Sequence, residues 1–122
     1  MKSLPRSLLL ALALTTCAWM PVQAQTFEQS LAAYQIKDYG TAFTGFKKLA
    51  EQGDAMAQFN LGVRYDDGRG VPKDDQLAYF WYLLASAQGD QDAVKNRDIV
   101  EKKLMPQQRA NAQAAARVWK PK

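Results

Sequence analysis

The sequence contains no histidine in 122 residues, and its single cysteine is Cys17. It therefore lacks the commonest zinc ligands, the Ser-His and Cys-His nucleophile pairs, and the usual general base at neutral pH. These absences argue against catalysis. We expect no catalytic residue, no cofactor and no metal site, and the sequence predicts a protein that is not an enzyme.

Long apolar runs are also missing, because no run reaches the roughly 20 residues that a membrane-spanning helix needs. The apolar run Leu8–Leu14 follows Lys2 and Arg6, and Val22-Gln23-Ala24 places small residues at the two positions that a signal peptidase reads. The sequence thus predicts no membrane span and a signal peptide at residues 1–24. The mature chain, residues 25–122, is then periplasmic or secreted.

Cys17 leaves one alternative open for the amino-terminal segment. It is in a position to be the lipid-modified cysteine of a bacterial lipoprotein, but the preceding residue, Thr16, is larger than such sites prefer. Cys17 is explained more simply as a small apolar residue of the signal core.

The chain has little net charge, but its charged residues are unevenly placed. Residues 25–94 carry 6 basic and 10 acidic residues, a net charge of −4, whereas residues 95–122 carry 8 basic and 2 acidic residues, a net charge of +6. The mature net charge of +2 is too small to indicate nucleic-acid binding. The basic carboxyl-terminal region favours an acidic protein partner or serves solubility.

What the sequence does contain is an internal repeat. When the chain is shifted by 36 residues, seven of the 24 aligned pairs between positions 38 and 61 are identical. The matched residues are Asp38, Ala42, Gln52, Gly53, Asp54, Ala57 and Asn60, which fall on Asp74, Ala78, Gln88, Gly89, Asp90, Ala93 and Asn96. A fixed period of this size predicts stacked helical hairpins.

Helical spacing and capping residues predict six helices. They are expected over residues 27–36, 41–52, 54–65, 76–88 and 91–103, with a sixth that begins near Pro106 and carries an apolar stripe of Ala110, Ala114, Ala115, Val118 and Trp119. Asp38-Tyr39-Gly40 is predicted as the first turn. Thr26, Asp54, and either Asp74 or Asp75 are expected to cap helices.

The loop over residues 66–73 offers two apparent ligand motifs that we interpret as structure. Asp66, Asp67, Asp74 and Asp75 lack the ligand alternation of a calcium loop, so we expect caps and solvated turn residues. Gly68-Arg69-Gly70 lacks the spacing of a phosphate-binding loop, so we expect a turn in which both glycines have positive φ.

The pattern of small and aromatic residues between positions 57 and 89 resembles one unit of the Sel-one-like repeat, a branch of the tetratricopeptide-like helical repeats. The matching residues are Ala57, Leu61, Gly62, Tyr65, Gly68, Gly70, Val71, Asp74, Ala78, Trp81, Tyr82, Ala85 and Gly89. The resemblance implies an all-α fold, a short right-handed α/α solenoid of helix-turn-helix repeats, with the best repeat at residues 54–89 and a carboxyl-terminal cap at residues 90–119. Gly62 is then a close-packing position against the helix over residues 78–85, with a hinge as the alternative.

The resemblance also implies a function, because members of this family act as adaptors. The expected protein is an exported, non-catalytic interaction module of the bacterial envelope, a monomer or small oligomer with an unidentified protein partner. The expected contact residues are Met56, Phe59, Asn60, Val63 and Asp67, and also Tyr79 and Phe80, whose neighbours Trp81 and Tyr82 match core positions. Two alternatives remain open: a cell-wall or β-lactam hydrolase, and a structural or inhibitory subunit of an envelope complex.

Overall fold

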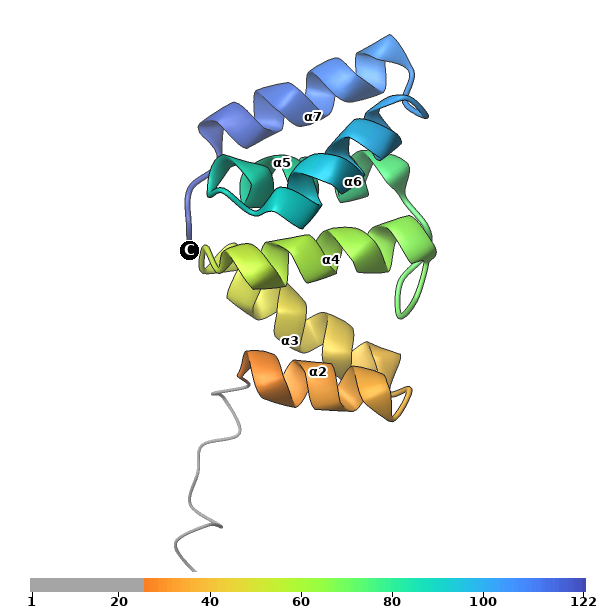
Figure 1. The fold of residues 1–122 in the computed structure, drawn as a ribbon, viewed down its shortest axis with the longest axis vertical. Coiled ribbons are helices and arrows are strands. Elements are labelled where there is room, and N and C mark those ends of the chain that lie inside the picture. Colours follow the sequence, from red (N-terminus) through yellow and green to blue (C-terminus); the bar gives the residue numbers. More distant parts are fainter. Residues whose placement is uncertain (1–25) are drawn as a thin grey trace, which may run out of the picture.

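The computed structural model describes residues 26–122, which form six helices and no strand (Figure 1). The helices are α2 (Phe27–Gln35), α3 (Tyr39–Glu51), α4 (Ala55–Asp67), α5 (Asp75–Ala87), α6 (Gln91–Glu101) and α7 (Pro106–Val118). The predicted signal peptide, its cleavage before Gln25 and the alternative lipidation of Cys17 lie outside the described residues. Within residues 26–122, no helix is long and apolar enough to cross a membrane.

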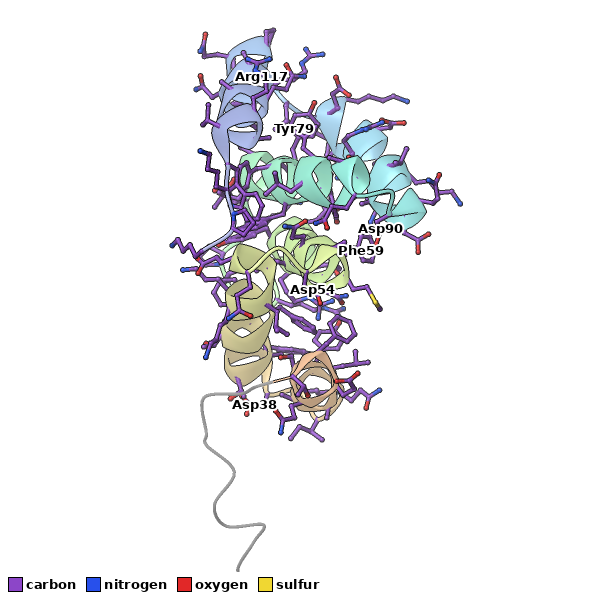
Figure 2. All side chains as sticks on the ribbon, turned by 90° about the vertical axis from the view of Figure 1, so that its left-hand side faces the viewer. Asp38, Asp54, Phe59, Tyr79, Asp90 and Arg117 are labelled. Carbon is purple, nitrogen blue, oxygen red and sulfur yellow. The ribbon has the colours of Figure 1, made fainter. Side chains whose placement is uncertain are left out.

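The six helices form three hairpins that stack along the long axis of the molecule, from α2 to α7 (Figure 1). We call α2, α4 and α6 the first-helix layer, and α3, α5 and α7 the second-helix layer. In Figure 2 the first-helix layer lies toward the right, and α3 and α7 lie toward the left. The expected all-α solenoid of helix-turn-helix hairpins is confirmed.

Aspartate caps start four of the helices and explain part of the sequence repeat. The carboxylates of Asp38, Asp54, Asp74 and Asp90 accept hydrogen bonds from backbone amides three residues later, at 3.3, 2.9, 3.0 and 2.9 Å. Such a cap contributes about 1 kcal/mol. The shift of 36 residues therefore superimposes equivalent capping positions, Asp38 on Asp74 and Asp54 on Asp90.

The predicted turn at Asp38-Tyr39-Gly40 is wrong. Because Asp38 is the N-cap of α3, Tyr39 and Gly40 belong to its first helical turn. The chain reverses just before Asp38, at Ile36 and Lys37, and Lys37 adopts a φ of 64°. The third predicted helix is also too short at its end, since α4 continues to Asp67 and stops at Gly68, which has a φ of 71°.

Helix α5 is the centre of the fold and packs against α4, α6 and α7. Its buried residues are Ala78, Tyr79, Trp81, Tyr82, Leu84 and Ala85. Gly62 of α4 faces this helix so closely that a Cβ atom there would lie 2.6 Å from Cε1 of Tyr82. The prediction that Gly62 allows close helix packing is therefore confirmed.

The apolar stripe predicted for α7 is largely wrong. Ala110, Ala114, Ala115 and Val118 are exposed, whereas Ala112 is buried and Ala116 is half-buried. The helix rests on α5 along Ala112 and Ala116, which lie two positions after Ala110 and Ala114 of the predicted line. The alanines of α7 occur on several sides of the helix, so their positions give few signals to distinguish these faces.

The carboxyl-terminal residues return from α7 to the junction of α3 and α4 (Figure 1). Trp119, half-buried, packs its ring edge-on against Trp81, with 6.4 Å between ring centroids. The backbone amide of Lys122 donates a hydrogen bond of 2.8 Å to the carbonyl oxygen of Glu51. This segment ties the last helix to the first half of the stack.

Candidate protein-binding surfaces

The five contact residues predicted on α4 follow one side of that helix at spacings of three or four residues. Met56 is 58% exposed and Asp67 is exposed, while Phe59, Asn60 and Val63 are half-buried. Phe59, labelled in Figure 2, packs on Tyr82 with 5.9 Å between ring centroids. Met56 is thus the most accessible apolar member of this α4 stripe, and Phe59 also supports the core.

The two contact residues predicted on α5 have different environments. Tyr79 is only 1% exposed, and its hydroxyl accepts a hydrogen bond of 3.0 Å from Nε2 of Gln113. The expectation that Tyr79 is free to bind is therefore wrong, because α7 covers it. Phe80 is half-buried and packs edge-on against Trp81 at 5.0 Å, so only part of its ring is accessible.

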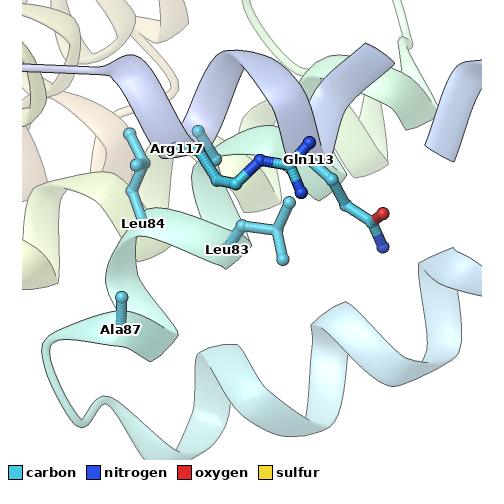
Figure 3. Close-up of a pocket in the computed structure, with 6 residues that line it drawn as sticks. Leu83, Leu84, Ala87, Gln113 and Arg117 are labelled. Carbon is cyan, nitrogen blue, oxygen red and sulfur yellow. The ribbon is translucent and has the colours of Figure 1, made fainter. Parts of the chain in front are cut away.

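Two cavities follow the seam where α7 crosses α5. The larger, about 370 Å³, is lined by Leu83, Leu84, Ala87, Gln113, Ala116 and Arg117 (Figure 3). The smaller, about 180 Å³, is lined by Gln76, Leu77, Phe80, Asn111, Ala112 and Ala115. Both arise because the short alanine side chains of α7 do not fill the space beside the large apolar side chains of α5.

A pair of arginines converges on Tyr34 where α4 meets α2. The guanidinium carbon of Arg64 lies 3.7 Å from the centroid of the Tyr34 ring, and Nη1 of Arg69 donates a hydrogen bond of 2.6 Å to the Tyr34 hydroxyl. Arg64 is only 5% exposed. The hydrogen bond to Tyr34, together with nearby charges, raises the pKa of Arg69.

The sequence interpretation missed Arg64, although its position carries a signal. Arg64 follows Ala57 by seven residues and Leu61 by three, and both of these residues are fully buried. A charged residue on the buried side of an amphipathic helix is unusual and marks a candidate site.

The acidic residues around the loop act as caps and ion-pair partners within residues 26–122. Of the two predicted caps, Asp74 and Asp75, Asp74 is the N-cap of α5. Nζ of Lys73 lies 2.9 Å from Oδ1 of Asp75 and 3.7 Å from Oδ1 of Asp66, and the hydrogen bond to Asp75 contributes most to a raised pKa of Lys73. In this part of the chain, no group of three or more His, Cys, Asp or Glu side chains is placed to hold a metal ion.

The basic carboxyl-terminal region is partly neutralised by contacts inside the protein. Nζ of Lys103 lies 3.7 Å from a carboxylate oxygen of Asp66, and Nη1 of Arg109 lies 3.7 Å from one of Glu101. The field that this region presents to a partner is therefore smaller than its net charge indicates.

Comparison with known proteins gives one family match and several partial relatives. The family model of the Sel1 repeat matches residues 55–90, one position from the predicted repeat. The "DAP3-binding cell death enhancer 1" proteins of Rattus norvegicus and Mus musculus are 46% identical over 37 residues, which is 30% of this chain and 7% of theirs. "Chitin synthase regulator SKT5" of Saccharomyces cerevisiae is 33% identical over 79 residues, 64% of this chain and 10% of its own length.

The similarity thus covers a repeat and its neighbourhood, because the matches span at most 10% of the length of these curated relatives. The matched segment corresponds to a complete hairpin, α4 with α5, in which Gly62 and Tyr82 interlock. Residues 55–90 therefore match the Sel1 repeat, the repeat that the sequence resemblance predicted for this segment.

Proposed function

We propose that this protein is a non-catalytic protein-binding module that acts as an exported adaptor of the bacterial envelope. The observation that carries the proposal is the α4 stripe. Met56, Phe59 and Val63 place apolar side chains on successive turns of the first helix of the Sel1 repeat, and the packing of the hairpin leaves them partly uncovered. Apolar anchors at helical spacing are a common way to recognise a partner segment.

The names of the partial relatives support a binding role. One is a regulator of chitin synthase and the other binds DAP3, so both names describe action on another protein. The shared segments are short, so we extend only the general role to this chain. The basic carboxyl-terminal region favours an acidic partner.

A site-specific photocrosslink tests the binding role on the protein in its native cell. A photoreactive amino acid replaces Met56 in one variant and Lys47, an exposed residue of α3 in the other layer, in the control. We expect a discrete adduct from position 56 that an excess of the unlabelled protein abolishes, and none from position 47. Adducts of equal yield at both positions, or none at position 56, would contradict the use of the α4 stripe.

Export is tested by the mass of the protein recovered from the envelope fraction. The signal-peptide pattern of residues 1–24 leads us to expect a mature chain that begins at Gln25. A mass that includes an acylated Cys17 would instead identify a lipoprotein. Recovery of the full-length chain from the cytoplasm would contradict export.

A further inference from the structure

The structure contains a buried positive charge without an anionic partner. Arg64 is 5% exposed, and its Nε and Nη1 atoms are buried with no hydrogen-bond partner among the described residues. Its guanidinium carbon lies 3.7 Å from the Tyr34 ring centroid and 5.9 Å from that of Phe46. Aromatic faces attract a cation but offer no lone pair to its N–H groups.

An unpaired buried charge is a costly arrangement for a fold to keep. Burial removes the hydration of the guanidinium group, and unsatisfied buried N–H donors forfeit hydrogen bonds that water would supply. A methionine of similar length would fill the same space without these losses. Stability therefore explains Arg64 poorly, and binding of a ligand explains it better.

A second guanidinium group faces the same tyrosine. Nη1 of Arg69 donates a 2.6 Å hydrogen bond to the hydroxyl of Tyr34. Within residues 26–122, no carboxylate lies within ion-pair distance of Arg64 or Arg69. Asp67 contributes to the raised pKa of Arg69 but forms no ion pair with it. Tyr34 thus joins two positive groups, neither of which is directly paired with a carboxylate.

The arginine pair borders the α4 stripe. Arg64 follows Asn60 by one helical turn and precedes Asp67 by three residues, so it lies beside the line of predicted contact residues on α4. Tyr34, which covers it, belongs to α2, the helix at the end of the stack. A segment that runs along α4 passes next to both guanidinium groups.

We propose that Arg64 and Arg69 bind an acidic side chain, Asp or Glu, of a partner peptide that lies along the α4 stripe. This inference rests on the proposed function and adds to it the chemistry of the partner. The carboxylate supplies the acceptors that the N–H groups of Arg64 lack, and the fork of a guanidinium group suits a bidentate pair with it. Because Nε and Nη1 are buried, binding requires the Tyr34 ring to move aside.

A selection from a random peptide library displayed on phage tests the proposal with the mature protein as bait. We expect the selected peptides to be enriched in Asp or Glu beside apolar residues. Binding of a selected peptide should weaken at least tenfold when its acidic residue becomes the amide, and at least tenfold when the protein carries Arg64→Met. With Arg64→Met, the substitution in the peptide should have no further effect.

Two variants control for charge and for folding. Lys47→Met removes one positive charge and introduces the same residue on exposed α3, and it should leave peptide affinity unchanged. Arg64→Met should melt at or above the wild-type temperature, because the variant no longer buries an unpaired charge. Should Arg64→Met fail to fold, Arg69→Gln provides the binding test, since Arg69 is exposed, and we expect it to weaken binding several-fold.

The outcomes separate this inference from the function on which it rests. Peptides without acidic residues that still bind through the α4 stripe would overturn the acidic-partner inference and leave the binding role intact. Unchanged affinity in both Arg64→Met and Arg69→Gln would overturn it as well. A selection that yields no binding peptide, together with no adduct at position 56, would overturn both.

Discussion

The central hairpin, α4 with α5, and the closing hairpin, α6 with α7, are built from different kinds of side chain. In the central hairpin, Leu61, Tyr79 and Tyr82 are almost fully buried, and Gly62 lets a tyrosine ring approach the helix backbone. In the closing hairpin, the buried residues are Ala93 and Val100 of α6, Leu104 of the connecting turn and Ala112 of α7. Helices α4 and α5 are thus held together by aromatic side chains between them, whereas α6 and α7 each pack mainly against α5 rather than against each other.

The difference shows which contacts define the fold and which only complete it. The buried residues of the Sel1 repeat lie in α4 and α5, where shape complementarity fixes the helix positions. The closing hairpin covers α5 but leaves two cavities at its seam. Substitutions should therefore have their largest effects in the central hairpin, unless they introduce a charge into the α5–α7 seam.

The largest effect is expected for Trp81→Ala. Trp81 is 7% exposed and contacts a cluster that includes Leu61, Leu84 and Trp119, so its loss leaves a large cavity in a small core. We expect the free energy of unfolding to fall by about 3 to 5 kcal/mol. Urea unfolding measures it, and a loss below about 1 kcal/mol would mean that the central core is not the main source of stability.

The next effect is expected in the closing hairpin for Ala112→Asp, with Ala114→Asp as the control. Ala112 is 3% exposed and faces α5, so a carboxylate there loses hydration and should lower the free energy of unfolding by about 2 to 3 kcal/mol. Ala114 is exposed on the same helix, so Ala114→Asp should change the free energy of unfolding by less than about 0.5 kcal/mol. Equal losses would contradict the orientation of α7.

A smaller effect is expected for Gly62→Ala, with Gly40→Ala as the control. A Cβ at Gly62 would lie 2.6 Å from the buried Tyr82 ring, whereas a Cβ at Gly40 in α3 meets nothing within 4 Å. The helix preference for alanine is offset at Gly62 by overpacking, so we expect a net loss of about 1 to 2 kcal/mol. Gly40→Ala should be neutral or stabilise by up to about 1 kcal/mol. Thermal unfolding of both variants decides whether the interlock is as tight as the structure shows.

The sequence predicted the central hairpin well for physical reasons. Gly62, Trp81 and Tyr82 have very small or very large side chains at the positions that the repeat requires. Asp54 and Asp74 mark helix starts because their carboxylates accept hydrogen bonds from backbone amides of the first turn. Tyr79 was misjudged because the residue that covers it, Gln113, comes from α7, 34 residues later. Periodicity reports which face of a helix is apolar and gives no information on which partner helix buries it.

The candidate site was less predictable than the fold. The α4 stripe follows from helical spacing alone, and Met56 is indeed exposed. The arginine pair does not follow, because Arg64 and Tyr34 are 30 positions apart and meet only when the first two hairpins stack. The prediction of an apolar stripe on α7 failed for a different reason, since the alanines of this helix occur on several of its sides.

The smallest effect concerns the contact between the two hairpins and is expected for Tyr82→Phe. The Tyr82 hydroxyl donates to Oδ2 of Asp66 at 3.3 Å and accepts from Nδ2 of Asn96 in α6 at 3.4 Å, so its removal should cost about 1 kcal/mol at neutral pH. Burial raises the pKa of Tyr82 far above its ordinary value of about 10, so the folded protein keeps a proton that the unfolded chain releases.

The stability that Tyr82 contributes is therefore fully present below about pH 10 and declines as the pH rises further. Urea unfolding of wild type and Tyr82→Phe between about pH 8 and about pH 11 measures the difference. We expect the wild-type free energy of unfolding to fall more steeply, with a residual slope in the variant because burial also raises the pKa of Tyr65. Equal slopes of the free energy of unfolding against pH in the two proteins would mean that the Tyr82 hydroxyl is hydrated in the folded protein. Helix α6 would then cover the central hairpin less closely than these hydrogen bonds indicate.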